Sequence, residues 1–79
     1  MKIKTAKRKY TPYTLLPVDG TKITQWVYDS GKSIRQLETE IGIFRNTIYR
    51  AMRGANLRIE TIQKIARAMG VDWKELVRW

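Results

Sequence analysis

The residues with the clearest chemical potential lie between Gly42 and Gly54, in the stretch GIFRNTIYRAMRG. At about 100° per residue, its long polar side chains fall within an arc of about 140° on a helical wheel. These side chains belong to Arg45, Asn46, Tyr49, Arg50 and Arg53. No acid occurs from Ile41 to Ile59, whereas a solvated helix face usually mixes charges because opposite signs stabilise it. The stripe therefore indicates a surface that binds a polyanion, and not a basic face that is only solvated.

These side chains match the chemistry of a DNA major groove, which is wide enough to admit an α-helix. Arginine can hydrogen-bond guanine at two points, and asparagine can do the same to adenine. We expect Asn46 and Arg50, with Arg45 and Tyr49 beside them, to read bases. Arg53 lies near the end of the helix and is expected at the DNA backbone.

The composition excludes several classes of protein. The 79 residues contain no cysteine and no histidine, which excludes disulfides, zinc-finger ligation and the commonest general base. The acids are scattered, and Glu38 and Glu40 lie two apart, where helical side chains do not face each other. We expect no catalytic site, no cofactor, no metal and no small-molecule ligand. The formal charge of +9 predicts a nucleic acid or another polyanion as partner.

The basic charge is concentrated at the N-terminus. Residues 1–18 contain five basic residues and no acid, and two prolines disfavour a long helix there. The prediction is a basic, partly flexible arm over 1–18, followed by one domain over 19–79. Lys7, Arg8 and Lys9 are expected to contact DNA phosphates or a minor groove; the alternative is a solubilising tail. With no long apolar run, we expect a cytoplasmic protein without a membrane span.

Apolar spacing predicts five helices and no sheet of any length after the arm. A short extended piece is expected around 13–18. Asp19 or Thr21 is the expected N-cap of the first helix, and Ser33 with Gln36 forms a capping box for the second. The five helices lie within DGTKITQWVYDSG, SIRQLETEIG, the stretch from Arg45 to Gly54, NLRIETIQKIARAMG and VDWKELVRW. The predicted fold class is a compact all-α domain.

The second and third helices carry a family resemblance. SIRQLETEIGIFRNTIYRAMRG resembles the helix-turn-helix of the phage-repressor and Cro (Xre-type) family. Ser33 matches the cap, Leu37 the inner Leu, Gly42 the turn Gly, Ile48 the inner Ile and Gly54 the closing Gly. IETIQKIARAMGVDWKEL resembles the family's fourth and fifth helices, so the resemblance covers about residues 21–77. It implies a five-helix, repressor-like domain.

Three residues depart from the family pattern. Glu38 stands where the family usually has a small Ala, and Phe44 replaces the usual Ser or Thr cap of the recognition helix. Ala51 replaces a larger aliphatic residue. A carboxylate at a close helix contact is costly unless it is paired or solvated. We expect Ala51 to compensate by making room.

The resemblance implies a sequence-specific double-stranded DNA-binding regulator, a repressor of bacterial or phage origin associated with the nucleoid. A recognition helix at about 45–53 would enter the major groove. Ser33, Arg35 and Thr47 are expected at the DNA backbone, together with Arg53. Two rivals remain: a protein-interaction module such as an antitoxin or anti-repressor, and an RNA-binding domain.

The C-terminal LVRW predicts an assembly surface. Val77 and Trp79 would form an exposed apolar patch at the end of the fifth helix. We expect a homodimer that uses this end.

Overall fold

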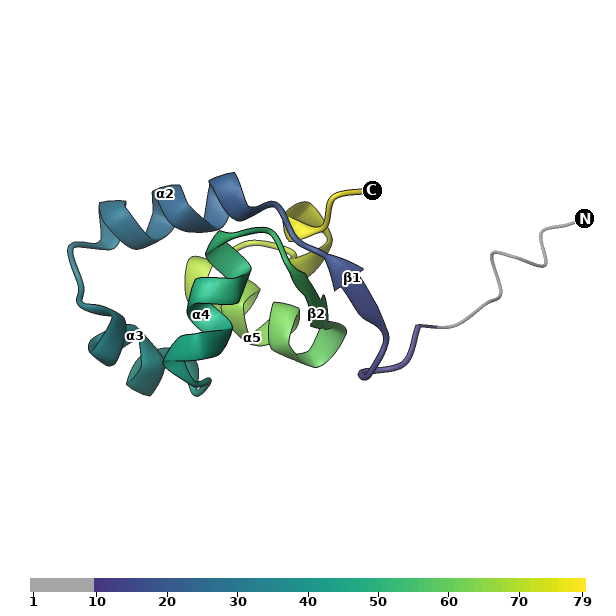
Figure 1. The fold of residues 1–79 in the computed structure, drawn as a ribbon, viewed down its shortest axis with the longest axis horizontal. Helices are drawn as coiled ribbons and strands as arrows, with labels where there is room; N and C mark the ends of the chain where they lie inside the picture. The colour runs from purple at the N-terminus through teal and green to yellow at the C-terminus, as the bar shows by residue number, and fades with distance from the viewer. Residues whose placement is uncertain (1–9) are drawn as a thin grey trace, which may run out of the picture.

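The computed structural model describes residues 10–79, which form a mostly helical domain with one small sheet (Figure 1). The predicted contacts of Lys7, Arg8 and Lys9 lie outside these residues. In chain order the elements are β1 (Leu15–Pro17), α2 (Gly20–Ser30), α3 (Ile34–Ile41), α4 (Arg45–Met52), β2 (Asn56–Arg58), α5 (Ile59–Met69) and the 3-10 helix η1 (Trp73–Leu76).

The last element differs from the expected fifth α-helix. It is one turn of 3-10 helix, capped by Asp72, whose carboxylate accepts from the Lys74 N–H at 3.1 Å. Val77 then adopts an extended conformation and forms an antiparallel bridge with Val18. Because this pairing requires extended backbone, the turn cannot continue as a helix. The five-helix count is corrected to four α-helices and one 3-10 turn among the described residues.

A two-stranded antiparallel sheet joins the start of the chain to its middle. In β1 and β2, Leu16 pairs with Leu57 and Pro17 pairs with Asn56. The extended piece expected around 13–18 is present as β1, but its partner β2 was not predicted. Only Leu57 of β2 is buried, and a three-residue strand is too short to show the alternation that indicates a strand.

The segment before β1 also completes helix α5. The N-cap residue of this helix, Arg58, makes no side-chain capping bond. Instead, the Ile59 N–H donates to the Thr14 carbonyl at 3.0 Å, and the Glu60 N–H donates to the Pro12 carbonyl at 3.1 Å. The second half of the predicted, partly flexible arm, residues 12–18, therefore belongs to the fold of the domain.

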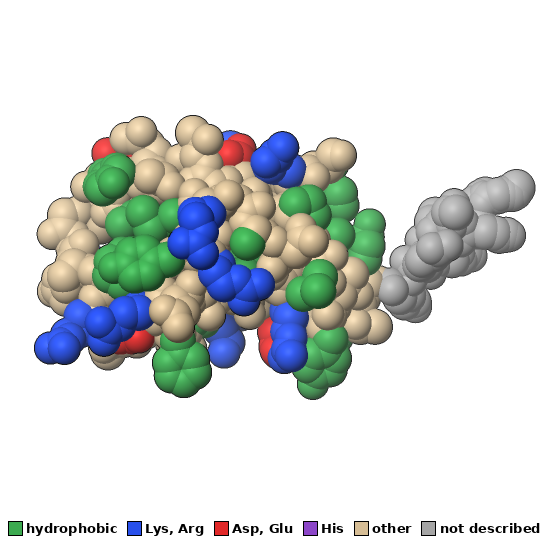
Figure 2. Space-filling view, viewed as in Figure 1, with side chains coloured by type: hydrophobic (Ala, Val, Ile, Leu, Met, Phe, Trp, Pro, Cys, Tyr) green, Lys and Arg blue, Asp and Glu red, His purple; other side chains and the backbone are tan. Residues whose placement is uncertain are grey.

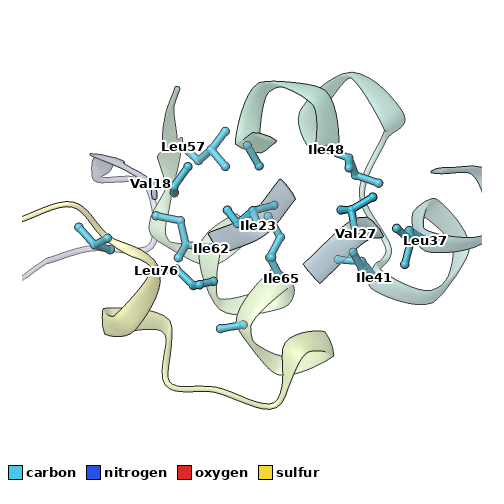
Figure 3. Packing of buried hydrophobic residues seen from close by; sticks show 13 residues of the cluster. Val18, Ile23, Val27, Leu37, Ile41, Ile48, Leu57, Ile62, Ile65 and Leu76 are labelled. Carbon is cyan, nitrogen blue, oxygen red and sulfur yellow. The ribbon is translucent and has the colours of Figure 1, made fainter. Parts of the chain in front are cut away.

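The core contains apolar side chains from every α-helix (Figure 3). Its largest fully buried members are Val18, Ile23, Leu37, Ile48, Ile62, Ile65 and Leu76. Figure 3 shows Val27, Leu37, Ile41 and Ile48 together at one end of this cluster, where α2, α3 and α4 meet. The buried faces of α3 and α4 are thus packed against the domain, and their polar faces point outward.

Helix α4 is also held at its C-terminal end by α2. A Cβ on Gly20 would lie 2.7 Å from the Gly54 nitrogen and closer still to the Met52 carbonyl oxygen. The Thr24 hydroxyl donates to the same Met52 carbonyl at 3.2 Å. Only glycine allows the start of α2 to approach the end of α4 this closely. Within residues 10–79, none of the helices has the length and apolar character needed to cross a membrane.

Candidate nucleic-acid interface

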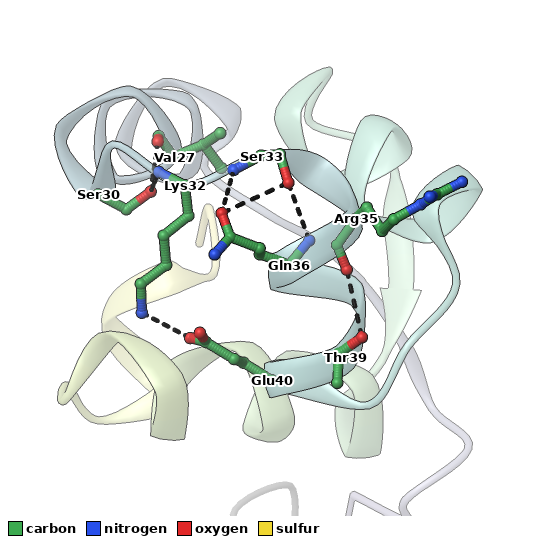
Figure 4. A network of polar contacts seen from close by, with 8 residues as sticks. All are labelled: Val27, Ser30, Lys32, Ser33, Arg35, Gln36, Thr39 and Glu40. Carbon is green, nitrogen blue, oxygen red and sulfur yellow. Dashed lines mark hydrogen bonds and ion pairs between the residues drawn. The ribbon is translucent and has the colours of Figure 1, made fainter.

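The helices α3 and α4 form a helix-turn-helix. Helix α3 begins at the predicted capping box: the Gln36 N–H donates to the Ser33 hydroxyl, and the Ser33 N–H donates to the Gln36 side-chain oxygen, both at 3.1 Å (Figure 4). It ends at Gly42, whose φ of +83° is in the left-handed region that favours glycine. The turn glycine and the cap are therefore confirmed as structural features of this unit.

Helix α4 presents a polar face outward. Ile48 and Ala51 are buried beneath it, as the helical wheel predicts. The five residues of the predicted stripe are all exposed: Arg45, Asn46, Tyr49, Arg50 and Arg53. Figure 2 shows Lys and Arg side chains gathered on the face where α4 lies. The structure brings these residues together, and their roles in binding remain predictions.

The predicted backbone contacts differ in their exposure. Ser33 and Arg35 are exposed at the start of α3, and the Arg35 side chain extends away from the capping network (Figure 4). Thr47 is half-buried, and it lines a hollow between α3, α4 and α5. Arg53 lies at the end of α4, where its N–H donates to the Tyr49 carbonyl at 3.1 Å. Thr47 is therefore the least accessible of the four.

The N-terminus of α4 is capped by an unexpected residue. Its N-cap, Phe44, has no side-chain acceptor. The Glu38 carboxylate accepts from the Arg45 N–H at 2.7 Å, and the Arg45 Nε lies 3.9 Å from the same oxygen. A carboxylate at this end is favourable because helix N-termini carry unpaired N–H groups and partial positive charge. Glu38 thus supplies the cap that Phe44 lacks.

This contact bears on two expectations from the sequence. The Glu38 carboxylate is compensated by its hydrogen bond to α4; Ala51 is fully buried in the core, and the expected compensation through space at Ala51 stays a prediction. The arginine stripe is not free of acids, since Glu38 pairs with Arg45 across the turn. The sequence did contain a signal for this pairing: an unusual acid and a missing cap occur within the same motif.

Arg50 lies between α4 and the small sheet. One guanidinium nitrogen, Nη2, donates to the Asn56 carbonyl at 3.2 Å. Arg50 and Thr47 line a hollow whose other walls include Asn56 and Arg58 of β2. The sequence did not place Asn56 at this surface, because the pairing of β2 with β1 brings it there.

Arg58 is the second cation beside this hollow. Its guanidinium lies 5.5 Å from the centre of the Tyr13 ring and 3.7 Å from a Glu60 carboxylate oxygen. Such an exposed ion pair is weak, and the Arg58 side chain is 57% exposed. Arg58 is therefore accessible to an anion that lies next to Arg50. None of the acids among residues 10–79 forms a group that could hold a metal ion.

The C-terminal end differs from the predicted apolar patch. Val77 is only 6% exposed and belongs to the core, so it cannot form part of an open surface. Trp79 is 70% exposed, and its indole N–H donates to the Lys74 carbonyl at 3.0 Å. Its ring lies 6.3 Å from that of Tyr10 and 6.4 Å from that of Trp73. The exposed rings at this end are Tyr10 and Trp79, and they lie beside the half-buried ring of Trp73.

Comparison with known proteins gives one match. The family model described as "Helix-turn-helix" matches residues 29–76, which is more than half of the chain and includes α3, α4 and α5. No curated protein and no solved structure matches the chain significantly.

The unusual cap makes the stability of α4 testable. Glu38→Ala should lower the free energy of unfolding by about 1 kcal/mol, because it leaves an N-terminal N–H of α4 unpaired. Glu38→Ala combined with Phe44→Ser should recover most of this loss, since serine at the N-cap restores an acceptor. Urea unfolding of the single and double variants measures both effects.

The matched control is Glu40→Ala on the same helix. Glu40 pairs with exposed Lys32 at 2.6 Å (Figure 4), and such exposed pairs contribute about 0–1 kcal/mol. No recovery by Phe44→Ser in the Glu38→Ala background, or an equal recovery in the Glu40→Ala background, would contradict the capping role of Glu38.

Proposed function

Because the chain belongs to the Cro- and Xre-like helix-turn-helix family, we propose that it is a sequence-specific regulator of transcription that binds double-stranded DNA. In this proposal α4 enters the major groove, and the protein represses transcription by occupying an operator, at the nucleoid in the cytoplasm. The observation that carries the proposal is the exposed stripe of Arg45, Asn46, Tyr49 and Arg50 on a helix whose opposite face is buried.

The charge distribution supports DNA over a neutral partner. Lysine and arginine side chains that neutralise phosphates release counterions, which drives binding without sequence preference. Sequence preference then comes from side chains that reach base edges. The stripe offers both kinds of donor on one helix face.

We assign Asn46 and Arg50 as the principal base readers. They lie four residues apart, about one helical turn, and both are exposed. Arg50 exchanges its hydrogen bond to the Asn56 carbonyl for a base edge when it binds. Arg45 serves a base or a phosphate, and Tyr49 contacts the backbone or a base beside them. Ser33, Arg35, Thr47 and Arg53 are assigned to the phosphate backbone.

Selection of bound sites from a random duplex pool tests the proposal directly. Enrichment of a defined sequence, with weaker binding to single strands and RNA of the same sequence, is the expected result. Binding without enrichment, or a preference for RNA, would contradict a sequence-specific DNA-binding function.

The assigned roles predict two classes of variant. Asn46→Ala or Arg50→Ala should each weaken the free energy of binding to the selected site by about 1–3 kcal/mol. Each should also relax the sequence preference at one or two base pairs. Arg53→Ala should weaken all sequences about equally, because phosphate contacts carry no direct sequence information. Fluorescence anisotropy on the selected duplex and on single-base variants measures both. Unchanged affinity and preference in the folded Asn46→Ala, Arg50→Ala double variant would overturn the assignment.

We also propose that Lys7, Arg8 and Lys9, in the basic segment ahead of β1, contact DNA phosphates. Each neutralised phosphate contributes about 0.9 to the slope of log affinity against log salt. Replacing all three residues by alanine should therefore flatten this slope by about 2 to 3. Titrations at several salt concentrations measure it. An unchanged slope would mean that these residues form a solvated tail.

Finally, we propose that the protein binds DNA as a homodimer through its C-terminal end, with Trp79 as the central residue. Two-fold dimers of helix-turn-helix domains read half-sites about 34 Å apart. Deleting Trp79 should weaken dimerisation and cooperative binding, as measured by sedimentation and by binding to paired half-sites. Tyr28→Ala is the matched control, since Tyr28 is equally exposed, at 72%, but lies on α2. Unchanged sedimentation after deletion of Trp79 would exclude this interface.

A further inference from the structure

The exposed aromatic ring at the start of α4 has no role in the assignments above. Phe44 is 79% exposed, the highest exposure among the large hydrophobic side chains of the described residues. It directly precedes Arg45 and Asn46 at the N-terminal end of the helix. Full burial of such a side chain is worth about 1.5–3 kcal/mol. A bound partner that covers the ring would gain much of this free energy.

The capping arrangement explains how this position can carry an aromatic residue. An N-cap position favours Ser, Thr, Asp or Asn, because their side chains accept from the first turn. Here the Glu38 carboxylate accepts from the Arg45 N–H instead. Because Glu38 supplies the acceptor for this N–H group, the residue at position 44 does not need a capping side chain. The Phe44 ring is therefore free to extend into solvent.

We propose that Phe44 is a specificity-determining residue that contacts the methyl group of a thymine in the major groove. The inference rests on the proposed function, in which α4 enters that groove. Residues at the N-terminal end of a recognition helix lie closest to base edges. Thymine is the only base that displays a methyl group there, and phenylalanine is one of the side chains that contact it.

The polar neighbours of Phe44 favour DNA over an apolar protein surface as the occupant. Arg45 follows it in the chain and is 56% exposed, and Asn46 is also exposed. Burying these donors against an apolar surface would leave their hydrogen bonds unmet. In the groove they bond to base edges or phosphates while the ring meets the methyl group. One thymine should therefore lie next to the base pairs read by Arg45 and Asn46.

The test removes the two contacting groups one at a time. The probe is the selected duplex, with each thymine in turn replaced by deoxyuridine, which lacks only the methyl group. Binding is measured for the wild-type protein, for Phe44→Ala and for Phe44→Leu, which keeps an apolar side chain. Tyr28→Ala is the control, since Tyr28 is an aromatic residue of similar exposure on another helix. Circular dichroism establishes that each variant is folded.

Phe44→Ala should weaken binding by about tenfold, and one thymine-to-uracil replacement should weaken wild-type binding by about threefold to fivefold, the value of one buried methyl group. At that position the two changes should not multiply, because contacting groups are energetically coupled. Phe44→Leu should keep most of the sensitivity to that replacement, and Tyr28→Ala should keep all of it.

Three results would overturn the proposal. They are unchanged affinity in Phe44→Ala, losses that multiply at every thymine, and a loss in Phe44→Ala with no thymine sensitivity in the wild type. If Asn46→Ala still relaxes preference in any of these cases, the proposed function stands and only the role of Phe44 fails. If the wild-type protein selects no duplex at all, the proposed function fails together with it.

Discussion

The helix-turn-helix of this chain depends on Glu38, which accepts a hydrogen bond from a backbone N–H group at each end of the turn. Its carbonyl accepts from the Gly42 N–H at 2.9 Å, which closes α3, and its carboxylate accepts from the Arg45 N–H at 2.7 Å, which opens α4. Both ends of a helix carry backbone groups without intrahelical partners. One residue therefore pairs a backbone group at each end of the turn, and it ties the orientation of α4 to that of α3.

The same constraint is met differently at α5. Its N-cap residue does not cap it, so carbonyl groups from residues 12–14 accept its first N–H groups. This requirement holds the chain that leads into β1 against the start of α5. The pairing of β1 with β2 then places Asn56 and Arg58 beside Arg50 of α4. The polar surface next to α4 is thus shaped by a segment that lies outside the residues matched by the family model.

The electrostatic character of the surface follows from where the acids are paired. Glu38 is turned toward the N-terminus of α4, and Glu60 lies beside Arg58. Each of these two carboxylates lies within salt-bridge distance of one arginine: Glu38 pairs with Arg45, and Glu60 pairs with Arg58. Arg50 and Arg53 of α4 have no acidic side chain within salt-bridge distance in the described structure. The face around α4 is therefore basic even though the domain contains acids.

The sequence by itself determined the four α-helices, the capping box at Ser33, the turn at Gly42 and the exposed stripe on α4. These features depend on helical periodicity and on contacts within a few residues, which can be read along the chain. The sequence marked Glu38 and Phe44 as unusual, but it did not pair the Glu38 carboxylate with the start of α4. Only the tertiary structure decided that pairing, the partner strand β2 and the burial of Val77. Each depends on a contact between separate elements: Val77, for example, pairs with Val18, 59 residues earlier in the chain. No local pattern encodes such a pairing, because its free energy comes from packing and hydrogen bonds that exist only once the elements have assembled.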